Sequence, residues 1–473
     1  MSLSSYVPAR SVVDLSSSDL FHYQFSSISQ FFVRCAPFVP PGCSDLIDFS
    51  DATSLFLLDY FASVPEIASN DIVRTQLDCT PVVKPHSPTL ADRQFVHVPN
   101  ETIKGNKPIS IGYPLSLLNI GFEAKWSIPA FMERVLSTQS SISVGVSQVL
   151  ALAQSSKFAS KFIVNTADSG YGQASFLSPT HAQENLCNIV RLKTRNVWEY
   201  SPKSGTGGAN KIYGAVYNLR QVGTQSTYRN PKTKELAPPK PIIHEREADE
   251  TDSYLMKTSK GKEVLVKLTL HKNMMIRGKD GFAMKDKPFN LVTVEHWDTQ
   301  TNAPLFKKPI YLAVSGKKYQ EIPLRQVYET HYLHRYDIEP NNRFLKQQLL
   351  LDKFQTPIDE HFDIWLSVLR LTEGLLLCAS NELKSTEAKK WQKYSEPKFD
   401  SERKRPTIAQ VRKSAQTLFL TFDKTPFLPQ ESKKGKGRVI GTKITEKPKL
   451  QPVKKQNKKK KKDLVTQKEK KNE

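Results

Sequence analysis

Apolar and polar positions along the chain change their period near residue 71, where a helical pattern gives way to strands. Residues 1–70 carry apolar clusters such as SISQFFVRCAPF and DATSLFLLDYFASV, which predict a small helical N-terminal unit. From residue 71 the segments DIVRTQLDCT, KPISIGYPLSLLNI and KFIVNTADS have the composition of buried strands, and SVGVSQVLALAQSSKFAS has that of a helix. Strands that alternate with helices predict an α/β sheet in residues 71–200.

The middle of the chain, residues 201–308, has a different pattern. Its first part is rich in Gly, Pro, Lys and Asn, and the later segments KEVLVKLTLHKNMMI and FNLVTVEHWDT alternate apolar and polar residues with a period of two. This alternation is typical of antiparallel strands, so we expect a β-rich insertion here. Helical patterns return after KKPIYLAVSG, and we expect residues 309–395 to form the second part of the domain that begins in residues 71–200. A C-terminal helical segment is expected over residues 396–432, where Pro406 precedes TIAQVRKSAQTLFL.

These patterns predict an α/β fold in which a mixed sheet, flanked by helices, is interrupted by the insertion. Beyond it, residues 433–473 hold seventeen Lys or Arg and four acidic residues, which is +13 of the total charge of +22. We expect a disordered basic tail. A run such as Lys458 to Lys462 is either simply solvated or bound to nucleic-acid phosphate, and the two interpretations are compatible.

The cysteines and the apolar segments indicate where the protein resides. The five cysteines are widely spaced and contain no C-x-x-C pair, which argues against a disulfide scaffold or a zinc ribbon and favours a reducing compartment. No stretch reaches the ~18 uncharged apolar residues that a membrane span needs. We therefore expect a cytoplasmic protein without membrane contact.

Two aspartates follow apolar runs that we interpret as strands. Asp78 ends the apolar part of VRTQLDCTP, and Asp168 ends that of FIVNTADSGY. Open α/β sheets place ligands at such strand ends. However, Asp also commonly begins a turn after a strand, so either aspartate alone indicates little.

A third acid stands in the segment YLHRYDIEPNNRFLK. Tyr332, Arg335, Glu339 and Lys346 follow the spacing Y-x2-R-x3-E-x6-K, and at ~100° per residue they fall within about 60° of one helical face. Such a face either lines a cleft or is a solvated surface with ion pairs. Pro340 lacks a backbone N–H, so we expect a kink or a new helix start there, with Tyr332 and Arg335 on a separate turn.

The four-residue spacing resembles the Y-R-E-K signature of bacterial insertion-sequence transposases of the DDE type. The segments LDCTPVVKPHSPTLADRQFVHVPNETIKGNKPISIG and ADSGYGQASFLSP resemble the blocks around that family's first and second catalytic aspartates, and the likeness covers most of residues 71–430. The resemblance implies an RNase H-like fold with a β-rich insertion between the second Asp and the Glu. It also implies cleavage and strand transfer of DNA at the ends of an insertion sequence.

The resemblance assigns roles to the three acids. Asp78, Asp168 and Glu339 would be catalytic and would hold two Mg²⁺ or Mn²⁺ ions, with Asp78 as the shared ligand. Carboxylate oxygens suit these hard cations. Two such ions ~3.5–4 Å apart activate the attacking hydroxyl and neutralise charge on the leaving oxygen.

The resemblance also implies DNA contacts. Arg335 and Lys346 would contact the DNA backbone or the scissile phosphate, and Tyr332 would orient that phosphate. Lys104 and Lys107 in IKGNKP flank a strong turn dipeptide, which is either a plain surface hairpin or a phosphate contact. The expected partner is double-stranded DNA, namely the terminal inverted repeats and the target, bound by a homodimer associated with the bacterial nucleoid.

Two other functions fit part of the sequence. One is a catalytically inactive or domesticated DNA-binding protein derived from a transposon, and the other is a host nuclease or resolvase with the same fold. The presence of all three acids argues against the first, and the Y-R-E-K spacing with its long insertion argues against the second. The sequence does not reveal which terminal repeat is recognised.

Overall fold

The computed structural model describes most of the chain. The described residues are 26–35, 49–98, 108–201, 213–220, 240–258, 261–278, 281–383, 406–422 and 448–454, together with Gly441 and several short runs before residue 22. Lys104 and Lys107 lie outside the described residues, as does the run Lys458 to Lys462.

One mixed sheet of twelve strands connects the described parts of the chain. Along its path lie, in spatial order, β2 (Gln94–His97), β3 (Ile109–Gly121), β1 (Ile72–Val83), β5 (Phe162–Ala167), β6 (Leu186–Arg191), β12 (Ile310–Gly316), β11 (Phe289–Asp298), β10 (Glu263–Met275), β7 (Asn196–Tyr200) and β8 (Tyr213–Asn218). β4 (Ser127–Arg134) pairs with β3, and β9 (Glu250–Lys257) pairs with β10. The expected mixed α/β sheet is confirmed.

The direction of the strands changes along the sheet. β1, β5 and β6 are parallel, whereas every other pairing among the described strands is antiparallel. β5 and β6 are buried along almost their whole length, as parallel strands covered on both faces are. β10 alternates buried and more exposed residues over its first half, as expected for an antiparallel strand with one covered face. The segment predicted to be β-rich contains β8 to β11.

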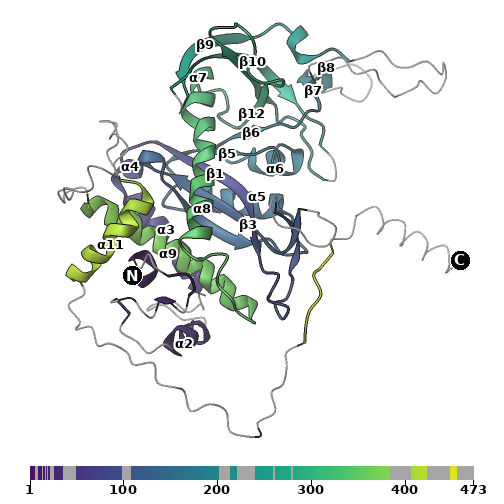
Figure 1. Ribbon diagram of the computed structural model, residues 1–473. Coiled ribbons are helices and arrows are strands. Elements are labelled where there is room, and N and C mark those ends of the chain that lie inside the picture. Colours follow the sequence, from purple (N-terminus) through teal and green to yellow (C-terminus); the bar gives the residue numbers. More distant parts are fainter. Residues whose placement is uncertain are drawn as a thin grey trace, which may run out of the picture.

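Helices cover the sheet on its sides (Figure 1). The α-helices are α1 (Ser2–Ser5), α2 (Ser26–Arg34), α3 (Phe49–Ser63), α4 (Pro65–Ala68), α5 (Ser141–Gln154), α6 (Ala174–Thr180), α7 (Leu324–Gln326), α8 (Ile338–Gln347), α9 (Asp359–Leu383) and α11 (Ile408–Phe422). Short 3-10 helices span Glu123–Lys125 and Ile243–Glu245. None of the helices in the described ranges is long and apolar enough to cross a membrane.

The buried apolar residues form two clusters. The larger one joins α3, α9 and α11 to β1, β3 and β4. The smaller one packs the segment that begins with Leu324 against β10, β11 and β12, and Tyr328 and Tyr332 of this segment are 3% and 1% exposed. The second cluster therefore fixes the chain that leads into α8.

A π-helix and a 3-10 helix lie directly before α8 in the chain. A π-helix spans Val327–His331, a 3-10 helix spans Tyr332–Asp337, and α8 begins at Ile338. Pro340 thus stands in the first turn of α8, where a backbone N–H has no partner within the helix and its absence costs little. Of the two expected outcomes, a kink or a new helix start, the structure shows a change from a 3-10 helix to an α-helix at Ile338, two residues before Pro340, and the separate turn expected for Tyr332 and Arg335 is observed.

Candidate active site

Asp78 and Asp168 are neighbours at the parallel centre of the sheet. In the register of β1 and β5 the last pair is Leu77 with Ala167, and each aspartate is the next residue of its strand. Neighbouring strands lie about 4.8 Å apart, so the fold alone brings the two residues together. The expectation that Asp78 ends its strand is wrong, because β1 stays paired with β3 as far as Val83. What ends at Asp78 is the pairing with β5.

The side chain of Asp78 points toward α8. Asn342 of α8 donates a hydrogen bond from Nδ2 to Asp78 Oδ2 at 3.2 Å. The preceding residue, Leu77, faces α5 instead, since a Cβ added to Gly145 of α5 would meet the Leu77 side chain at 2.9 Å. Successive strand residues point to opposite faces. Asp78 is therefore on the face of the sheet along which α8 runs.

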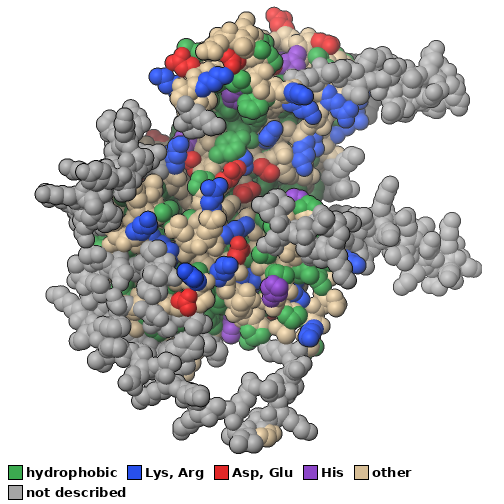
Figure 2. Space-filling model, viewed as in Figure 1, with side chains coloured by type: hydrophobic (Ala, Val, Ile, Leu, Met, Phe, Trp, Pro, Cys, Tyr) green, Lys and Arg blue, Asp and Glu red, His purple; other side chains and the backbone are tan. Residues whose placement is uncertain are grey.

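Glu339 reaches the same region from the first turn of α8. Its side chain is 58% exposed and forms an ion pair with Arg335, in which Nη2 and Oε1 are 3.4 Å apart. Figure 2 shows acidic side chains exposed near the middle of the face along which α8 runs, with Lys and Arg side chains around them. Glu339 is close enough to Asp78 to raise the pKa of that carboxyl, but its own carboxylate is paired with Arg335.

The electrostatics of Asp78 connect the three acids. Burial raises the pKa of the Asp78 carboxyl, and a hydrogen bond from the Cys79 backbone lowers it. The carboxylates of Asp168 and Glu339 raise this pKa further, and Arg335 opposes them. The net shift is upward. Because like charges disfavour ionisation, Asp168 and Glu339 add to the upward shift that burial causes in the Asp78 pKa.

Arg335 lies between the acids. Its guanidinium stands over the Tyr336 ring at 4.4 Å and pairs with Glu339. Burial alone would lower the pKa of Arg335, but Tyr332, Tyr336 and Asp78 outweigh burial and raise it. Arg335 therefore remains charged and supplies positive potential at the cluster.

Tyr332 is covered rather than exposed at the site. It is 1% exposed, and burial raises the pKa of its hydroxyl to about 12. Arg335 and Arg191 lower this pKa, whereas Tyr336 and Asp168 raise it. The hydroxyl is therefore protonated at neutral pH and lies within electrostatic reach of Asp168.

Lys346 is bound to β1 beside Asp78. Its Nζ donates to Thr80 Oγ1 at 2.8 Å and to the Pro81 carbonyl at 2.6 Å. Burial lowers the pKa of Lys346, and the carboxylates of Asp352 and Asp78 oppose this shift. Lys346 therefore contacts β1 at Thr80 and Pro81, two and three residues after Asp78.

The sequence analysis missed two residues of this region. Asn342, which contacts Asp78, follows Glu339 by three residues and precedes Lys346 by four, so the same helical-face argument could have identified it. Tyr171 is 3% exposed; burial raises the pKa of its hydroxyl well above 10, and Asp78 and nearby groups add to the shift. No signal in the sequence places Tyr171 here.

The donor set fits a hard divalent cation. Carboxylate oxygens from three acids, with the amide oxygen of Asn342, are the ligands that Mg²⁺ and Mn²⁺ prefer. Asn342 Oδ1 is buried and accepts no hydrogen bond from the described residues. Within those residues no three His, Cys, Asp or Glu side chains are close enough to hold an ion as they stand. A site shared by all three acids therefore requires Glu339 to leave its ion pair with Arg335.

Comparison with known proteins adds no relatives. No family model matches this sequence, and no curated protein matches it. The functional interpretation therefore depends on the geometry of the acid cluster and on the resemblance of its sequence motifs.

Proposed function

We propose that this protein is a DDE transposase, which uses divalent metal ions to cut DNA at the ends of an insertion sequence and to join those ends to target DNA. One observation carries the proposal: Asp78 and Asp168 directly follow the last paired residues of β1 and β5, and α8, which carries Glu339, contacts Asp78 through the hydrogen bond from Asn342. Metal-free carboxylates gathered in this way repel one another. Such a cluster is costly without a cation and is typical of sites that bind one.

The RNase H-like fold is part of this proposal. Its support is the mixed sheet, in which Asp78 lies on β1 and Asp168 directly follows the adjacent parallel strand β5, together with the third acid on α8, which comes after β12 in the chain. The antiparallel strands β8 to β11 lie between the second Asp and the Glu, where the resemblance expects an insertion.

The acids, Asn342 and Arg335 have different roles in the proposed reaction. Asp78, Asp168 and Glu339 would hold two Mg²⁺ or Mn²⁺ ions, which when bound activate the attacking water or 3′-hydroxyl and neutralise the leaving oxygen. Asn342 orients the Asp78 carboxylate through its hydrogen bond. Arg335 keeps positive charge at the cluster, so that a phosphate is attracted to an otherwise acidic surface.

The DNA partners follow from the proposed reaction. The protein would bind the terminal inverted repeats and then the target, as a homodimer that pairs two ends. Lys346, which is hydrogen-bonded to β1 beside Asp78, would contact the backbone near the scissile phosphate. Tyr332 would act from its buried position by orienting that phosphate through a protonated hydroxyl.

A catalytically inactive DNA-binding protein is the alternative. The observation that favours it is the position of Glu339, whose side chain is 58% exposed and paired with Arg335. A protein that no longer needed this acid as a ligand would tolerate such a position. The two functions differ in whether the protein cuts the DNA that it binds.

A cleavage assay separates the two functions. Asp78→Ala, Asp168→Ala and Glu339→Ala should each abolish Mg²⁺-dependent cleavage of DNA that carries the inverted repeats flanking the reading frame, while folding and binding of these ends persist. Glu360→Ala is the matched control, because Glu360 is an exposed acid in the first turn of another helix. Cleavage at the wild-type rate by any of the three variants removes that residue from the site. Binding without cleavage by the wild-type protein favours the alternative.

A further inference from the structure

The ion pair between Arg335 and Glu339 has the geometry of a weak contact. Arg335 Nη2 and Glu339 Oε1 are 3.4 Å apart, whereas charge-assisted hydrogen bonds of this kind are commonly ~2.7–2.9 Å long. The Glu339 side chain is largely exposed, and ion pairs whose charges reach water contribute little to stability. Glu339 can therefore leave this partner at small cost.

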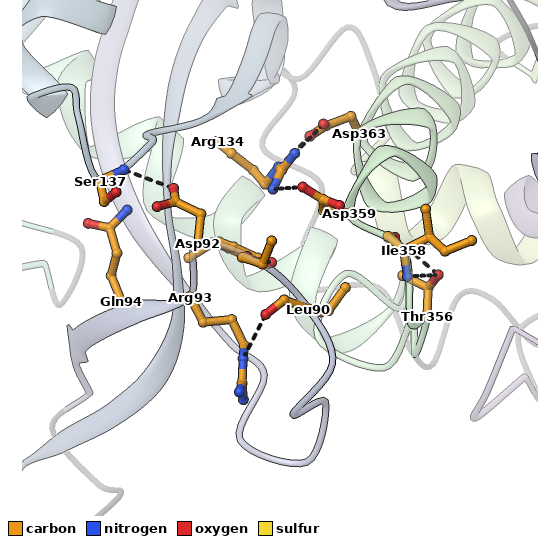
Figure 3. A network of polar contacts seen from close by, with 12 residues as sticks. Leu90, Asp92, Arg93, Gln94, Arg134, Ser137, Thr356, Ile358, Asp359 and Asp363 are labelled. Carbon is orange, nitrogen blue, oxygen red and sulfur yellow. Dashed lines mark hydrogen bonds and ion pairs between the residues drawn. The ribbon is translucent and has the colours of Figure 1, made fainter. Parts of the chain in front are cut away.

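A second arginine shows the geometry of a firmly held pair in the same protein. Arg134 of β4 donates from Nε to Asp363 Oδ1 at 2.6 Å and bonds the other oxygen of that carboxylate through Nη2, and its Nη1 lies 3.6 Å from Asp359 Oδ2. Figure 3 shows Arg134 directed at both aspartates near the start of α9. The Arg134 side chain is 8% exposed. This pair is bidentate and buried, so it is suited to be a permanent anchor, whereas the Arg335 pair is suited to exchange.

The helix that carries Glu339 is fixed to the sheet at other points. Asn342 bonds Asp78, and Lys346 donates two hydrogen bonds to β1. Lys84 of β1, which is 1% exposed, donates from Nζ to three backbone carbonyls in the turn after α8 at 2.7, 3.1 and 3.2 Å. A change of partner by Glu339 is therefore a rotation of its side chain and does not require α8 to move.

Arg335 has donors that Glu339 does not use. Its Nε is buried and has no hydrogen-bond partner among the residues that the structure describes. The side chain is 12% exposed, so part of it still reaches solvent. A guanidinium presents its N–H groups in a planar fork that matches two oxygens of a phosphate. A phosphate should therefore bind Arg335 better than one carboxylate oxygen at 3.4 Å does.

We propose that Arg335 withholds Glu339 from the two aspartates until a backbone phosphate of DNA binds Arg335, and that Glu339 then turns toward Asp78 and completes the metal site. The proposal rests on the proposed function, because it takes Glu339 as a metal ligand and DNA as the partner. It adds a regulation of that site, namely that the DNA substrate assembles it. Without DNA, a divalent ion would be held by Asp78 and Asp168 without the third acid.

This exchange gives the exposed position of Glu339 a role in an active enzyme. The same position favours the catalytically inactive alternative if it is the final one. In the proposed exchange it belongs to the DNA-free state only. The complete metal site, and the activated water or hydroxyl that it supplies, would then form only when a phosphodiester is present.

The exchange is tested by the affinity for Mn²⁺, measured from the EPR signal of the free ion. Glu339→Gln and the wild-type protein are compared alone and with a duplex that carries the inverted repeat and whose end is already cut, so that no bond remains to be cleaved there. Alone, the two proteins should bind Mn²⁺ almost equally. With the duplex, the variant should bind at least ~10-fold more weakly, since even loss of a residue that only orients a ligand typically costs 10–100-fold. Metal bound by the DNA itself is common to both samples.

Glu329→Gln is the matched control. Glu329 pairs with Arg325 at the same i,i+4 spacing and at 3.7 Å, and its side chain is half exposed. Arg325 also pairs with Asp252 of β9, in the β-rich segment. Neutralising Glu329 should leave the affinity for Mn²⁺ unchanged with and without the duplex.

Removal of the cation tests the exchange without DNA. Arg335→Met frees Glu339, so the protein alone should bind Mn²⁺ more tightly, partly through the ligand and partly through loss of a positive charge near the ion. Arg335→Met/Glu339→Gln keeps only the second part. The cost of Glu339→Gln should therefore be large in the Arg335→Met protein and small in the wild-type protein.

Two results would overturn the exchange. An equal effect of Glu339→Gln with and without the duplex would make Glu339 a permanent ligand and would leave the transposase mechanism standing. No effect in either state or in the Arg335→Met protein would remove Glu339 from the metal site and would contradict the proposed function as well.

Discussion

Asp78 and Asp168 each follow directly on the last paired residues of two neighbouring parallel strands. Their separation is therefore set by the spacing of the strands and not by side-chain flexibility. β1 continues beyond Asp78 in its antiparallel pairing with β3, so that this carboxylate projects from a strand held on one side only. Glu339 differs from the two aspartates, because its side chain is 58% exposed and is paired with Arg335.

Asn342 should matter for catalysis although it carries no charge. Asn342→Ala removes the hydrogen bond to Asp78 Oδ2, and loss of a residue that orients a metal ligand typically costs 10–100-fold in activity or metal affinity. We expect cleavage to fall by about this factor while end binding and thermal stability change little. Gln347→Ala, at an exposed position of the same helix, is the control. Equal cleavage rates of the two variants would exclude Asn342 from the site.

Lys84 should hold the end of α8 in place. Lys84→Met leaves three carbonyls without their donor, which should lower the free energy of unfolding by roughly 1–3 kcal/mol. Lys353→Met, in the same turn but exposed, should have almost no effect in urea unfolding. Restoration of stability by Lys84→Arg but not by Lys84→Gln would show that a cation is required. Equal stabilities of the Lys84→Met and Lys353→Met variants would contradict this role.

Glu373 should make stability depend on pH. This carboxyl in α9 is 0% exposed, and burial raises its pKa well above the ordinary value of 4.5, with the Asn341 side chain opposing the shift. The folded state therefore keeps a proton that the unfolded chain releases. The stability contributed by the neutral acid is fully present below pH 4.5 and is lost as the pH rises toward the folded pKa.

Glu373→Gln removes this titration. In urea unfolding at pH 5 and pH 8, the wild-type protein should lose more stability between the two values than the variant does. Glu360→Gln, an exposed acid on the same helix, should behave like the wild-type protein. The same pH dependence in both variants would show that Glu373 ionises as readily in the folded state as in the unfolded chain.

The Asp78 carboxylate should lower the free energy of unfolding when no divalent ion is present. Its pKa is raised by burial and by the two other acids, so its ionised form is disfavoured in the folded state at neutral pH. Asp78→Asn should therefore raise the free energy of unfolding in EDTA by roughly 0.5–2 kcal/mol. Addition of Mg²⁺ should stabilise the wild-type protein more than the variant. Equal stabilisation of both by Mg²⁺ would argue that Asp78 is not a metal ligand.

The sequence predicted the sheet better than it predicted the site. The apolar run before Asp168 was interpreted correctly, because a short buried strand followed by a polar turn has a clear composition. Asp78 was expected at the end of its strand, where the apolar run ends. The strand in fact loses its pairing with β5 there but keeps its pairing with β3, and the sequence of one strand does not show which neighbours it has. Glu339 was found through the resemblance, since a helical-face pattern alone also fits a solvated surface.

Contacts between distant segments explain what the sequence did not show. Asn342 and Asp78 are 264 positions apart, and only the crossing of α8 over β1 makes them partners. Lys84 stands between Val83 and Pro85 with no sign that it would be buried, because its three acceptors come from a turn some 270 residues later. Leu450 and Val453, in the tail expected to be disordered, donate backbone hydrogen bonds to the carbonyls of Pro88 and Arg93. The basic composition around them, which is typical of a solvated tail, gives no sign of these contacts.

Iron-directed cleavage of the polypeptide tests most directly whether the three acids form one metal site. Fe²⁺ replaces Mg²⁺ in oxygen-ligand sites, and with ascorbate and peroxide it generates radicals that cut the main chain close to the ion. We predict cuts near Asp78, Asp168 and Glu339, suppressed by excess Mg²⁺ and lost together in Asp78→Asn. Cuts confined to other segments, or cuts near the three acids that persist unchanged in Asp78→Asn, would contradict a shared metal site and the transposase mechanism that depends on it.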